Sequence, residues 1–301
     1  MLKDNMTTAP LTSIKRFAVH DGPGIRTTLF LKGCPLRCIW CHNPETQRPS
    51  PELCIHYAKC RGCGECAKVC GCHVIENGRH EFNRAECHSC GRCADACLFD
   101  ALELFGRETT VAEAAERLLE DRIFYADGGG ITLSGGEPLL HPDFCAEVLA
   151  IMKAEGIHSA VDTCGHVRWN AFEAVLPYAD MFLYDFKCAD SERHRQLTGA
   201  GNETIIDNLI RLGDTGKTVE IRMVMVPNHN MDKPNLQKAA DILRAVKGIS
   251  AIRLLPYHSM ARSKYASIDH ADTMPNVDSP TTDELEHAAA ILRNSGHRII
   301  L

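Results

Sequence analysis

The sequence lacks any long apolar segment and any excess of positive charge. No stretch approaches the roughly 20 apolar residues that a membrane-spanning helix needs, so we expect no such helix. The formal net charge of −6 argues against a general nucleic-acid binder, which is usually basic. The N-terminus, residues 1–6, also lacks the charged-then-apolar pattern of a secretory signal. These absences predict a cytoplasmic protein that binds neither membranes nor nucleic acid.

Cysteine, in contrast, is abundant. The chain has 16 cysteines in 301 residues, and none follows Cys188. In a small secreted chain such a number would predict a disulfide framework, but no secretory signal is present here. We therefore expect a reducing compartment in which the thiolates serve as metal ligands. Clustered thiols oxidise readily, which suggests an oxygen-poor setting.

Three cysteines lie close together in residues 33–45, which read GCPLRCIWCHNPE. Cys34, Cys38 and Cys41 follow the spacing C-x3-C-x2-C, and Trp40 precedes the third cysteine. Three thiolates cannot complete a four-cysteine site, but they can hold three irons of a 4Fe–4S cube. The fourth iron would stay open for a substrate or cofactor. A zinc knuckle or three unrelated core thiols are the alternatives.

A short apolar run precedes this loop. Residues 27–32 (TTLFLK) predict a buried strand that ends at Gly33. In α/β barrels the chemistry lies at the C-terminal ends of the strands, which is where this places the cysteines. Residues 1–14 are expected to be a polar leader.

Residues 48–105 carry a second cysteine pattern, C-x2-C-x2-C-x3-C, which occurs twice. The second copy begins 27 residues after the first. The eight cysteines are Cys60, Cys63, Cys66, Cys70, Cys87, Cys90, Cys93 and Cys97. The duplicated spacing is typical of iron–sulfur ligands, and two zinc sites are the alternative.

From residue 109 onward, amphipathic helices alternate with apolar strands in about six units. Thr110 with Glu113, and Thr281 with Glu284, predict capping boxes for helices over 109–123 and 281–294. Such alternation predicts a parallel sheet with right-handed crossovers. Six units are too few for a closed eight-stranded barrel.

Polar residues gather near the C-terminal ends of these predicted strands. A charge inside an apolar strand is costly unless it is paired, and several together are what a polar cofactor site requires. Internal ion pairs between strands are the alternative. These residues are Asp162, Asp185, Lys187, Arg222 and His258.

A glycine-rich turn follows the strand predicted at 130–134. It reads Gly135-Gly136-Glu137-Pro138, and its glycines allow the backbone to approach a ligand closely. Glu137 could accept hydrogen bonds from an ammonium group.

The cysteine loop, with an aromatic residue before its third cysteine, resembles the signature of the radical S-adenosylmethionine (SAM) enzymes. DGPGIRT at 21–27, CHNPE at 41–45, the duplicated cysteine runs and LLPYH at 254–258 are more specifically similar to the glycyl-radical-enzyme activating enzymes. The resemblance covers nearly the whole chain. It implies an α/β fold: a partial, open (β/α)6 TIM-like barrel from residues 1–47 and 106–301, with residues 48–105 inserted as a bacterial-ferredoxin-like domain.

The resemblance also implies three 4Fe–4S clusters. Cys34, Cys38 and Cys41 would hold the catalytic, SAM-binding cluster. In two-cluster ferredoxins the fourth cysteine of each run ligates the other cluster. The first insert cluster would therefore have Cys60, Cys63, Cys66 and Cys97 as ligands, and the second Cys87, Cys90, Cys93 and Cys70.

The insert departs from the ferredoxin pattern in one respect. The proline that usually follows the fourth cysteine is replaced by Gly71 and Leu98. Cys72 could compete as a ligand, whereas Cys54 is expected to be a free thiol. Three further cysteines are expected to be small buried side chains, namely Cys145, Cys164 and Cys188.

The resemblance assigns SAM contacts to the polar residues. Gly135, Gly136 and Glu137 match the motif for the methionyl amino group. Asp162 and Thr163 match a pair that binds a monovalent cation beside the SAM carboxylate in relatives. The remaining cofactor-binding candidates are Trp40, Asp185, Lys187, Arg222 and His258.

The implied activity is that of an oxidoreductase. Reductive cleavage of SAM would give a 5′-deoxyadenosyl radical, which takes a hydrogen from a backbone glycine of a partner glycyl radical enzyme. The partner's glycine loop would enter the open barrel as an extended peptide. The insert clusters would relay electrons from a flavodoxin or ferredoxin, or shape the docking surface, and the chain is expected to be a monomer.

Two other functions remain open at this point. One is a radical SAM peptide maturase with auxiliary clusters, although those usually carry the extra cysteines after the barrel. The other is a multi-cluster electron-transfer ferredoxin, which would leave GGEP, DTCG and LLPYH unexplained. Among activating enzymes, the insert favours a dehydratase, lyase or decarboxylase as partner.

Overall fold

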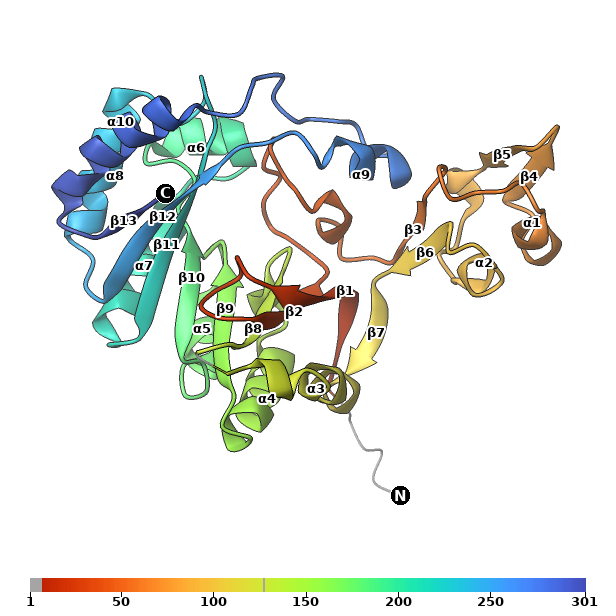
Figure 1. The fold of residues 1–301 in the computed structure, drawn as a ribbon, viewed down its shortest axis with the longest axis horizontal. Helices are drawn as coiled ribbons and strands as arrows, with labels where there is room; N and C mark the ends of the chain where they lie inside the picture. The colour runs from red at the N-terminus through yellow and green to blue at the C-terminus, as the bar shows by residue number, and fades with distance from the viewer. Residues whose placement is uncertain (1–6, 127) are drawn as a thin grey trace.

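A nine-stranded, open and curved sheet forms the larger part of the computed structural model, which describes residues 7–126 and 128–301 (Figure 1). The strand order is β13-β12-β11-β10-β9-β8-β2-β1-β7. The strands are β1 (Thr8–Ala18), β2 (Arg26–Leu31), β7 (Arg107–Thr110), β8 (Gly130–Gly135), β9 (His158–Thr163), β10 (Met181–Asp185), β11 (Thr218–Met225), β12 (Ile249–Pro256) and β13 (Ile299–Ile300).

The sheet is parallel from β2 through β8 to β13, and β1 runs antiparallel to both β2 and β7. β2, β8 and β10 are buried over nearly their whole length, as expected for strands of a parallel sheet that are covered on both faces. The expected open, mainly parallel α/β sheet is confirmed.

The expectation of a polar leader over residues 1–14 is wrong for the part that the structure describes; residues 1–6 lie outside it. Residues from Thr8 onward form β1, whose Ala9 is fully buried. The strand is stabilised by pairing on both sides, with β2 and with Arg107–Thr110 about 100 residues away. The predicted helix from 109 accordingly begins later, after β7.

Helices cover the outer face of the sheet, and the main apolar core lies between the two layers (Figure 1). Both predicted capping boxes are present, at Thr110 with Glu113 and at Thr281 with Glu284. No described helix is long and apolar enough to cross a membrane. The helices are α3 (Val111–Leu119), α4 (Pro142–Ala154), α5 (Trp169–Val175), α6 (Ser191–Thr198), α7 (Glu203–Asp214), α8 (Lys233–Arg244), α9 (Arg262–Ser267) and α10 (Thr282–Leu292).

The other face of the sheet is concave and carries the charges. Side chains alternate between faces along a strand, so the buried Ile221 packs toward the helices and Arg222 points the other way. Asp185 lies directly opposite Arg222 in the sheet register, and Leu183 lies opposite Asp162. Asp162, Asp185 and Arg222 therefore share the concave face.

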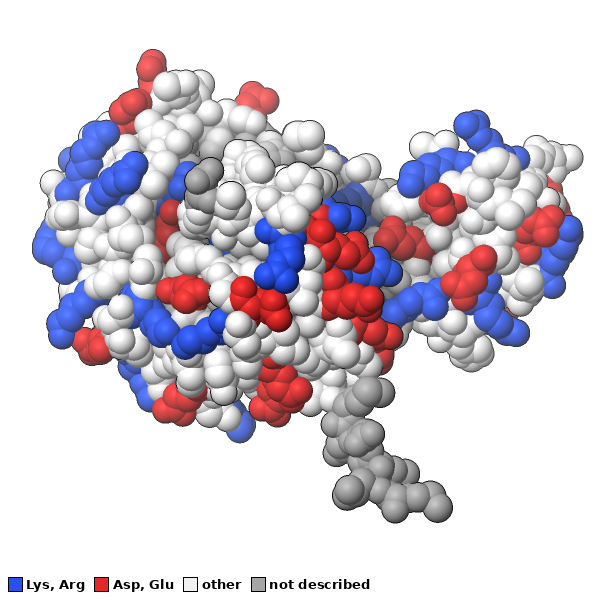
Figure 2. Space-filling model, turned by 60° about the horizontal axis from the view of Figure 1, so that its bottom comes forward, with Lys and Arg blue, Asp and Glu red and all other residues white. Residues whose placement is uncertain are grey.

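Residues 52–105 form a smaller lobe beside the sheet (Figure 1). Its stem is a pair of antiparallel strands, β3 (Glu52–Ile55) and β6 (Leu102–Phe105). Figure 2 shows this lobe standing away from the larger one, with charges of both signs on the visible face. The lobe's other elements are α1 (Glu65–Val69), β4 (His73–Glu76), β5 (Arg79–Phe82) and α2 (Arg92–Asp95).

A buried ion pair joins the lobe to the sheet. Lys32, at the end of β2, is fully buried, and its Nζ lies 2.6 Å from Glu52 Oε2 in β3. Lys32 also donates to the Glu45 carbonyl at 2.6 Å, and His270 Nε2 lies 2.9 Å from Glu52 Oε1. Because removing one partner of a buried pair leaves an uncompensated charge, this contact stabilises the attachment of the lobe.

Replacing Lys32 by methionine is expected to destabilise the protein by about 3 kcal/mol, because Glu52 stays buried without its main cation. The measurement is the thermal unfolding midpoint of the anaerobically loaded protein. The matched control is Lys68→Met, which removes an exposed i,i+3 pair with Glu65 and should leave the midpoint nearly unchanged. Equal midpoints for the two variants would contradict this account of the junction.

Candidate functional site

The cysteine loop begins where β2 ends. Gly33 has a φ of 103°, a conformation that favours glycine, and this residue turns the chain out of the sheet. The loop then folds back on itself, since Gly33 N donates to the Thr46 carbonyl at 2.7 Å and Cys34 N to the Gln47 carbonyl at 3.1 Å. The three cysteines are thus held inside a closed backbone loop.

The thiols of this loop lie close together in partly buried positions. Burial raises the pKa of Cys38 to about 12 and also raises the pKa of Cys41. A hydrogen bond from the Cys164 thiol lowers the pKa of Cys34. Because a buried thiolate needs a nearby positive charge, the three sulfurs are suited to a metal centre, and the donor set fits a 4Fe–4S cluster with three protein ligands.

The glycine-rich turn after β8 touches the cysteine loop through the backbone. A Cβ added at Gly136 would lie 2.1 Å from the Gly33 carbonyl oxygen and 2.7 Å from that of Thr46. Glu137 N donates to the Gly33 carbonyl at 2.8 Å. The turn therefore requires glycine at 136 and fixes the start of the cysteine loop.

The Glu137 carboxylate faces its own chain. It is fully buried and accepts from Leu139 N at 3.0 Å, Thr163 Oγ1 at 2.8 Å and Cys164 N at 2.7 Å. Burial raises its pKa, and these donors oppose that shift. Glu137 thus joins the ends of β8 and β9. A direct contact between Glu137 and an ammonium group stays a prediction, as does a cation site at Thr163.

On the concave face, Asp162 and Arg222 form an ion pair whose hydrogen-bonding capacity is only partly used. Arg222 Nη1 lies 3.4 Å from Asp162 Oδ1, and Ser134 donates to Asp162 Oδ2 at 2.7 Å. Burial raises the pKa of Asp162 to about 6, against the opposing effect of Arg222. Asp162 Oδ1 and Arg222 Nε are buried, and neither atom has a hydrogen-bond partner among the residues that the structure describes. Such orphaned polar atoms fit a site that takes a polar ligand.

Lys187 connects this charged face to the cysteine loop. Its Nζ lies 2.9 Å from Asp185 Oδ2, just beyond the end of β10. Burial disfavours its charge, but Asp185 and the nearby Cys38 and Cys164 outweigh burial and raise the pKa of Lys187. The ammonium group is therefore a fixed positive charge beside the sulfurs. These strand-end charges also form the internal ion pairs that were the alternative interpretation.

Two other predicted residues lie at the rim. His258 is exposed, and its ring lies 4.2 Å from that of His42, which donates to the His258 carbonyl at 3.0 Å. Trp40 is only 3% exposed and packs in an apolar cluster with Tyr257 and Tyr265. Contacts of Trp40 and His258 with a cofactor stay predictions.

Sequence reasoning missed the residues that close the loop from the far end of the chain. Lys264, in α9, donates to Asn43 Oδ1 at 2.9 Å and to Glu45 Oε1 at 2.7 Å. Tyr265 donates to the Cys41 carbonyl at 3.0 Å. These partners lie more than 200 residues apart, and no local pattern links them.

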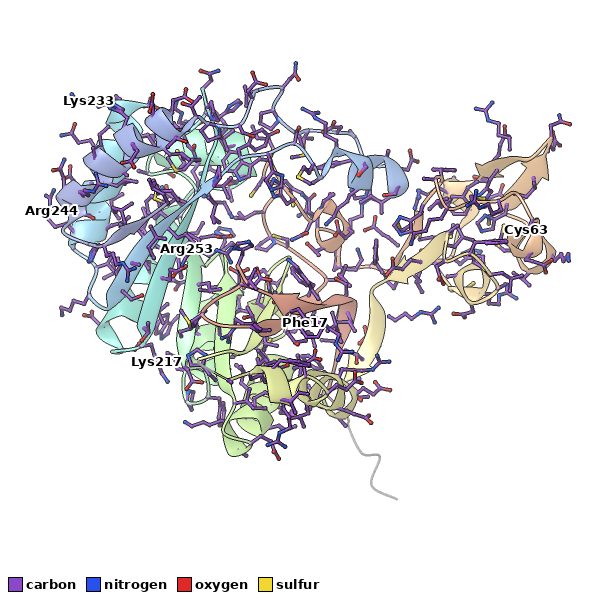
Figure 3. The ribbon with its side chains drawn as sticks, in the orientation of Figure 1. Phe17, Cys63, Lys217, Lys233, Arg244 and Arg253 are labelled. Atoms are coloured by element: carbon purple, nitrogen blue, oxygen red, sulfur yellow. The ribbon has the colours of Figure 1, made fainter. Side chains whose placement is uncertain are left out.

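The smaller lobe brings together the cysteines of the first predicted set. A single cavity is lined by Cys60, Cys63, Cys66 and Cys97. Cys66 lies in α1, and the labelled Cys63 lies far out on the lobe (Figure 3).

The second set also gathers in the lobe. Burial raises the pKa of Cys93 to about 11, and the nearby Cys70 and Cys87 add to the shift. Cys72 lies beside Cys70, and Cys54 is buried 3.6 Å from His56 Nε2. The gathered thiols fit iron–sulfur sites by their donor chemistry.

Two buried histidines of the lobe were also missed. His73 Nδ1 lies 2.8 Å from His80 Nε2, and His80 Nδ1 lies 3.6 Å from Cys60 Sγ. Burial lowers the pKa of His73 to about 4 and also lowers that of His80, so both rings are neutral near pH 7. Asn77-Gly78, a strong hairpin signal, could have revealed the β4–β5 hairpin that carries them.

Replacing Gly136 by alanine is expected to displace the cysteine loop, since the new Cβ would overlap the Gly33 carbonyl. The loaded protein should lose about four irons, those of one 4Fe–4S cube. Iron per chain is measured after anaerobic reconstitution. The control is Gly71→Ala, where the added Cβ meets nothing within 4 Å. Full iron content in the Gly136 variant would show that this close approach does not hold the loop.

Comparison with known proteins agrees with this geometry. Residues 28–238 match the model of the radical SAM superfamily. The chain is 38% identical to the trans-4-hydroxy-L-proline dehydratase activating enzyme of Clostridioides difficile, over 94% of this chain and 95% of that protein. It is 39% identical to the choline trimethylamine-lyase activating enzyme of Oleidesulfovibrio alaskensis, over 95% of each.

Among solved structures, a radical SAM methyltransferase from Sphaerobacter thermophilus matches with a TM-score of 0.53. That alignment covers 97% of this chain and 76% of the other at 15% identity, so it shows the fold alone. With this fold, a three-cysteine loop at the end of β2 and near-full-length relatives that are activating enzymes, the chain belongs to the radical SAM superfamily and, within it, to the activating enzymes of glycyl radical enzymes.

Proposed function

We propose that this chain activates a partner glycyl radical enzyme, using a 4Fe–4S cluster held by Cys34, Cys38 and Cys41. The observation that carries the proposal is the junction of the cysteine loop with the glycine-rich turn at Gly136, next to the charged concave face. When bound, the cluster supplies the electron that cleaves SAM, and the resulting radical takes a hydrogen from the partner's glycine.

The residues of the chain orient SAM in this proposal. Arg222 Nε, which has no partner of its own, can donate to the SAM carboxylate. Lys187 keeps a positive charge beside the sulfurs, and Asp185 holds Lys187 in place. His258, exposed at the rim, is available to the ribose or adenine. Asp162 already faces Arg222, so a monovalent cation there would share its carboxylate with the guanidinium.

The partner enters from the open side of the sheet. Because the concave face is not closed by further strands, an extended glycine-bearing peptide can reach the strand ends. The relatives from Clostridioides difficile and Oleidesulfovibrio alaskensis activate a dehydratase and a lyase, as their names state. We infer a glycyl radical enzyme of one of these classes as partner and a monomeric activating enzyme.

We further infer two 4Fe–4S clusters in the smaller lobe, an inserted domain of bacterial-ferredoxin type over residues 48–105. The shared cavity of Cys60, Cys63, Cys66 and Cys97 supports the first ligand set. The proximity of Cys70, Cys87 and Cys93, with Cys90 from the same run, supports the second. Their role is to pass electrons from a flavodoxin or ferredoxin toward the Cys34 loop.

No disulfide joins any of the sixteen cysteines, all of which lie in the described residues. This supports a reducing compartment, and we infer a cytoplasmic enzyme.

The first test is reductive SAM cleavage. The anaerobically reconstituted protein should hold about twelve irons and form 5′-deoxyadenosine from SAM with dithionite. A variant with alanine at Cys34, Cys38 and Cys41 should keep about eight irons and lose cleavage, because its only open iron is gone.

With candidate dehydratases and lyases, the wild-type protein should then generate a glycyl radical signal in electron paramagnetic resonance (EPR) spectra. SAM cleavage that persists in the triple variant would contradict the proposal.

A second test concerns the smaller lobe. Cys63→Ala should remove about four irons and keep cleavage driven by dithionite, which is small enough to reduce the Cys34 cluster directly. Cleavage driven by a reduced flavodoxin should fall sharply in the same variant. Cys54→Ala is the control, since this buried thiol lies outside both runs. If flavodoxin-driven cleavage persists without the first lobe cluster, that cluster is not part of the electron path.

A further inference from the structure

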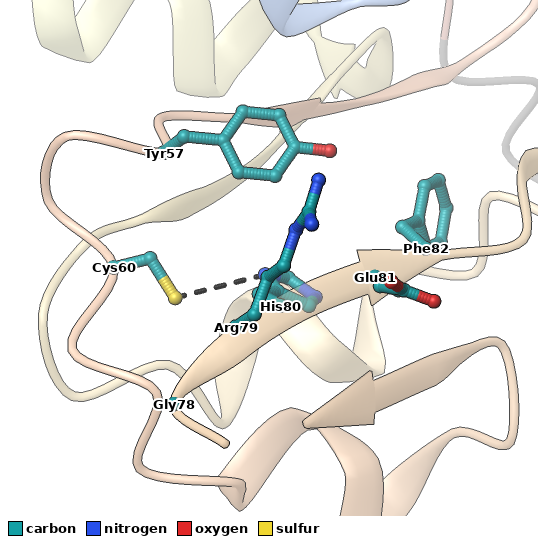
Figure 4. Close-up of a pocket in the computed structure, with 7 residues that line it drawn as sticks. All are labelled: Tyr57, Cys60, Gly78, Arg79, His80, Glu81 and Phe82. Atoms are coloured by element: carbon teal, nitrogen blue, oxygen red, sulfur yellow. Dashed lines mark hydrogen bonds between the residues drawn. The ribbon is translucent and has the colours of Figure 1, made fainter. Parts of the chain in front are cut away.

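The histidine pair of the smaller lobe lies against the first predicted ligand set. Figure 4 shows His80 pointing toward Cys60, with Nδ1 and Sγ 3.6 Å apart. One ring atom each from His73 and His80 also lies within 4.8 Å of Cys66 Sγ, and all three side chains are buried. Two of the four sulfurs of this set are therefore next to imidazole nitrogens.

The fold holds both rings firmly. His73 and His80 lie on adjacent strands of the β4–β5 hairpin, whose turn, Asn77-Gly78, has positive φ at both residues. The ring of His73 also stacks on that of Phe82, with centroids 4.7 Å apart. Because the rings are fixed by strand pairing and stacking, the contact with Cys60 follows from the fold rather than from a mobile side chain.

The direction of the hydrogen bonds follows from what each atom can do. A cysteine that ligates iron is a thiolate and can only accept, so His80 Nδ1 must carry the proton toward Cys60. In a neutral ring Nε2 of His80 is then an acceptor, and His73 Nδ1 must donate to it. His73 Nε2 is left as a buried nitrogen without a partner, in agreement with the structure.

We propose that His80, oriented by His73, donates a hydrogen bond to the Cys60 sulfur and raises the reduction potential of the cluster held by Cys60, Cys63, Cys66 and Cys97. The inference rests on the lobe cluster of the proposed function. Reduction adds negative charge to the cluster, and a hydrogen bond to a ligand sulfur stabilises that charge. His80 and His73 are positioning residues here, not ligands.

The duplicated half of the lobe does not repeat this arrangement. The positions 27 residues after His73 and His80 are Asp100 and Arg107. Arg107 Nη2 donates to Asp95 Oδ1 at 2.5 Å, so these positions do not carry a pair of hydrogen-bonded histidine rings. The two clusters would thus have the same kind of ligands but different surroundings, with a histidine ring beside Cys60 in the first and the Arg92 guanidinium beside Cys90 in the second.

The test is a potentiometric titration of the fully loaded protein, followed by EPR. Cys63→Ala identifies the signal of the first lobe cluster by removing it. His80→Phe keeps the ring volume without the N–H, and should lower the midpoint potential of that signal. His73→Phe should also lower the midpoint potential, because Nε2 of His80 then loses the donor that fixes the orientation of the His80 ring. His88→Gln, at an exposed histidine of the second run, should leave it unchanged.

A second readout separates hydrogen bonding from ligation. With 15N-labelled histidine, the pulsed EPR spectrum of the reduced first cluster should show a weak nitrogen coupling that His80→Phe removes. A strong coupling would mean that His80 is a ligand and would overturn the proposal. An unchanged midpoint potential in both histidine variants would also overturn it. If the His80→Phe variant loses iron, the midpoint potential of the first lobe cluster in His73→Phe becomes the test, and an unchanged value there overturns the proposal. If Cys63→Ala removes no iron, the lobe cluster itself is wrong, while SAM cleavage still tests the Cys34 site separately.

Discussion

The buried carboxylate of Glu137 is the constraint on which the rest of the site depends. An ionised group in the core is costly unless it is fully hydrogen-bonded, and this one accepts from Leu139, Thr163 and Cys164. The backbone nitrogen of Glu137 donates to Gly33. One residue therefore locks the ends of β2, β8 and β9 together. The sulfur of Cys34 and the carboxylate of Asp162, in β9, can keep a fixed geometry only because these strand ends cannot shift independently.

A second set of charged contacts extends this order beyond the sheet. Lys32 reaches from β2 to Glu52 in the stem of the smaller lobe, while Lys264 reaches from α9 to Glu45 in the cysteine loop. The loop is thus held from the sheet, from the lobe and from the C-terminal part of the chain. The Lys32–Glu52 pair ties the stem of the lobe to the end of β2, where the cysteine loop begins. In the proposed electron relay, this contact would hold the lobe cysteines near the loop.

The sequence predicted the features that depend on local spacing. The cysteine runs, both capping boxes and the alternation of strands and helices are encoded within a few neighbouring residues. Sequence reasoning failed where the contacting residues lie far apart in the chain. The strand β1 depends on pairing with Arg107–Thr110, and Lys264 holds the cysteine loop through Glu45, which lies 219 positions away. The sequence also did not reveal that the Glu137 carboxylate accepts from Thr163 and Cys164, which lie 26 and 27 positions away.

In the smaller lobe, too, local spacing predicts the cysteine ligands but not the residues that surround them. A duplication supplies two sets of four cysteines, and the ligands alone would give two similar potentials. A relay between similar sites has no preferred direction, whereas a difference in potential lets an electron settle on one of them. The hairpin around Asn77-Gly78 places His80 against Cys60, and its counterpart in the second run is Arg107. In the proposed relay, the asymmetry would therefore come from the residues outside the cysteine pattern, which the spacing does not constrain.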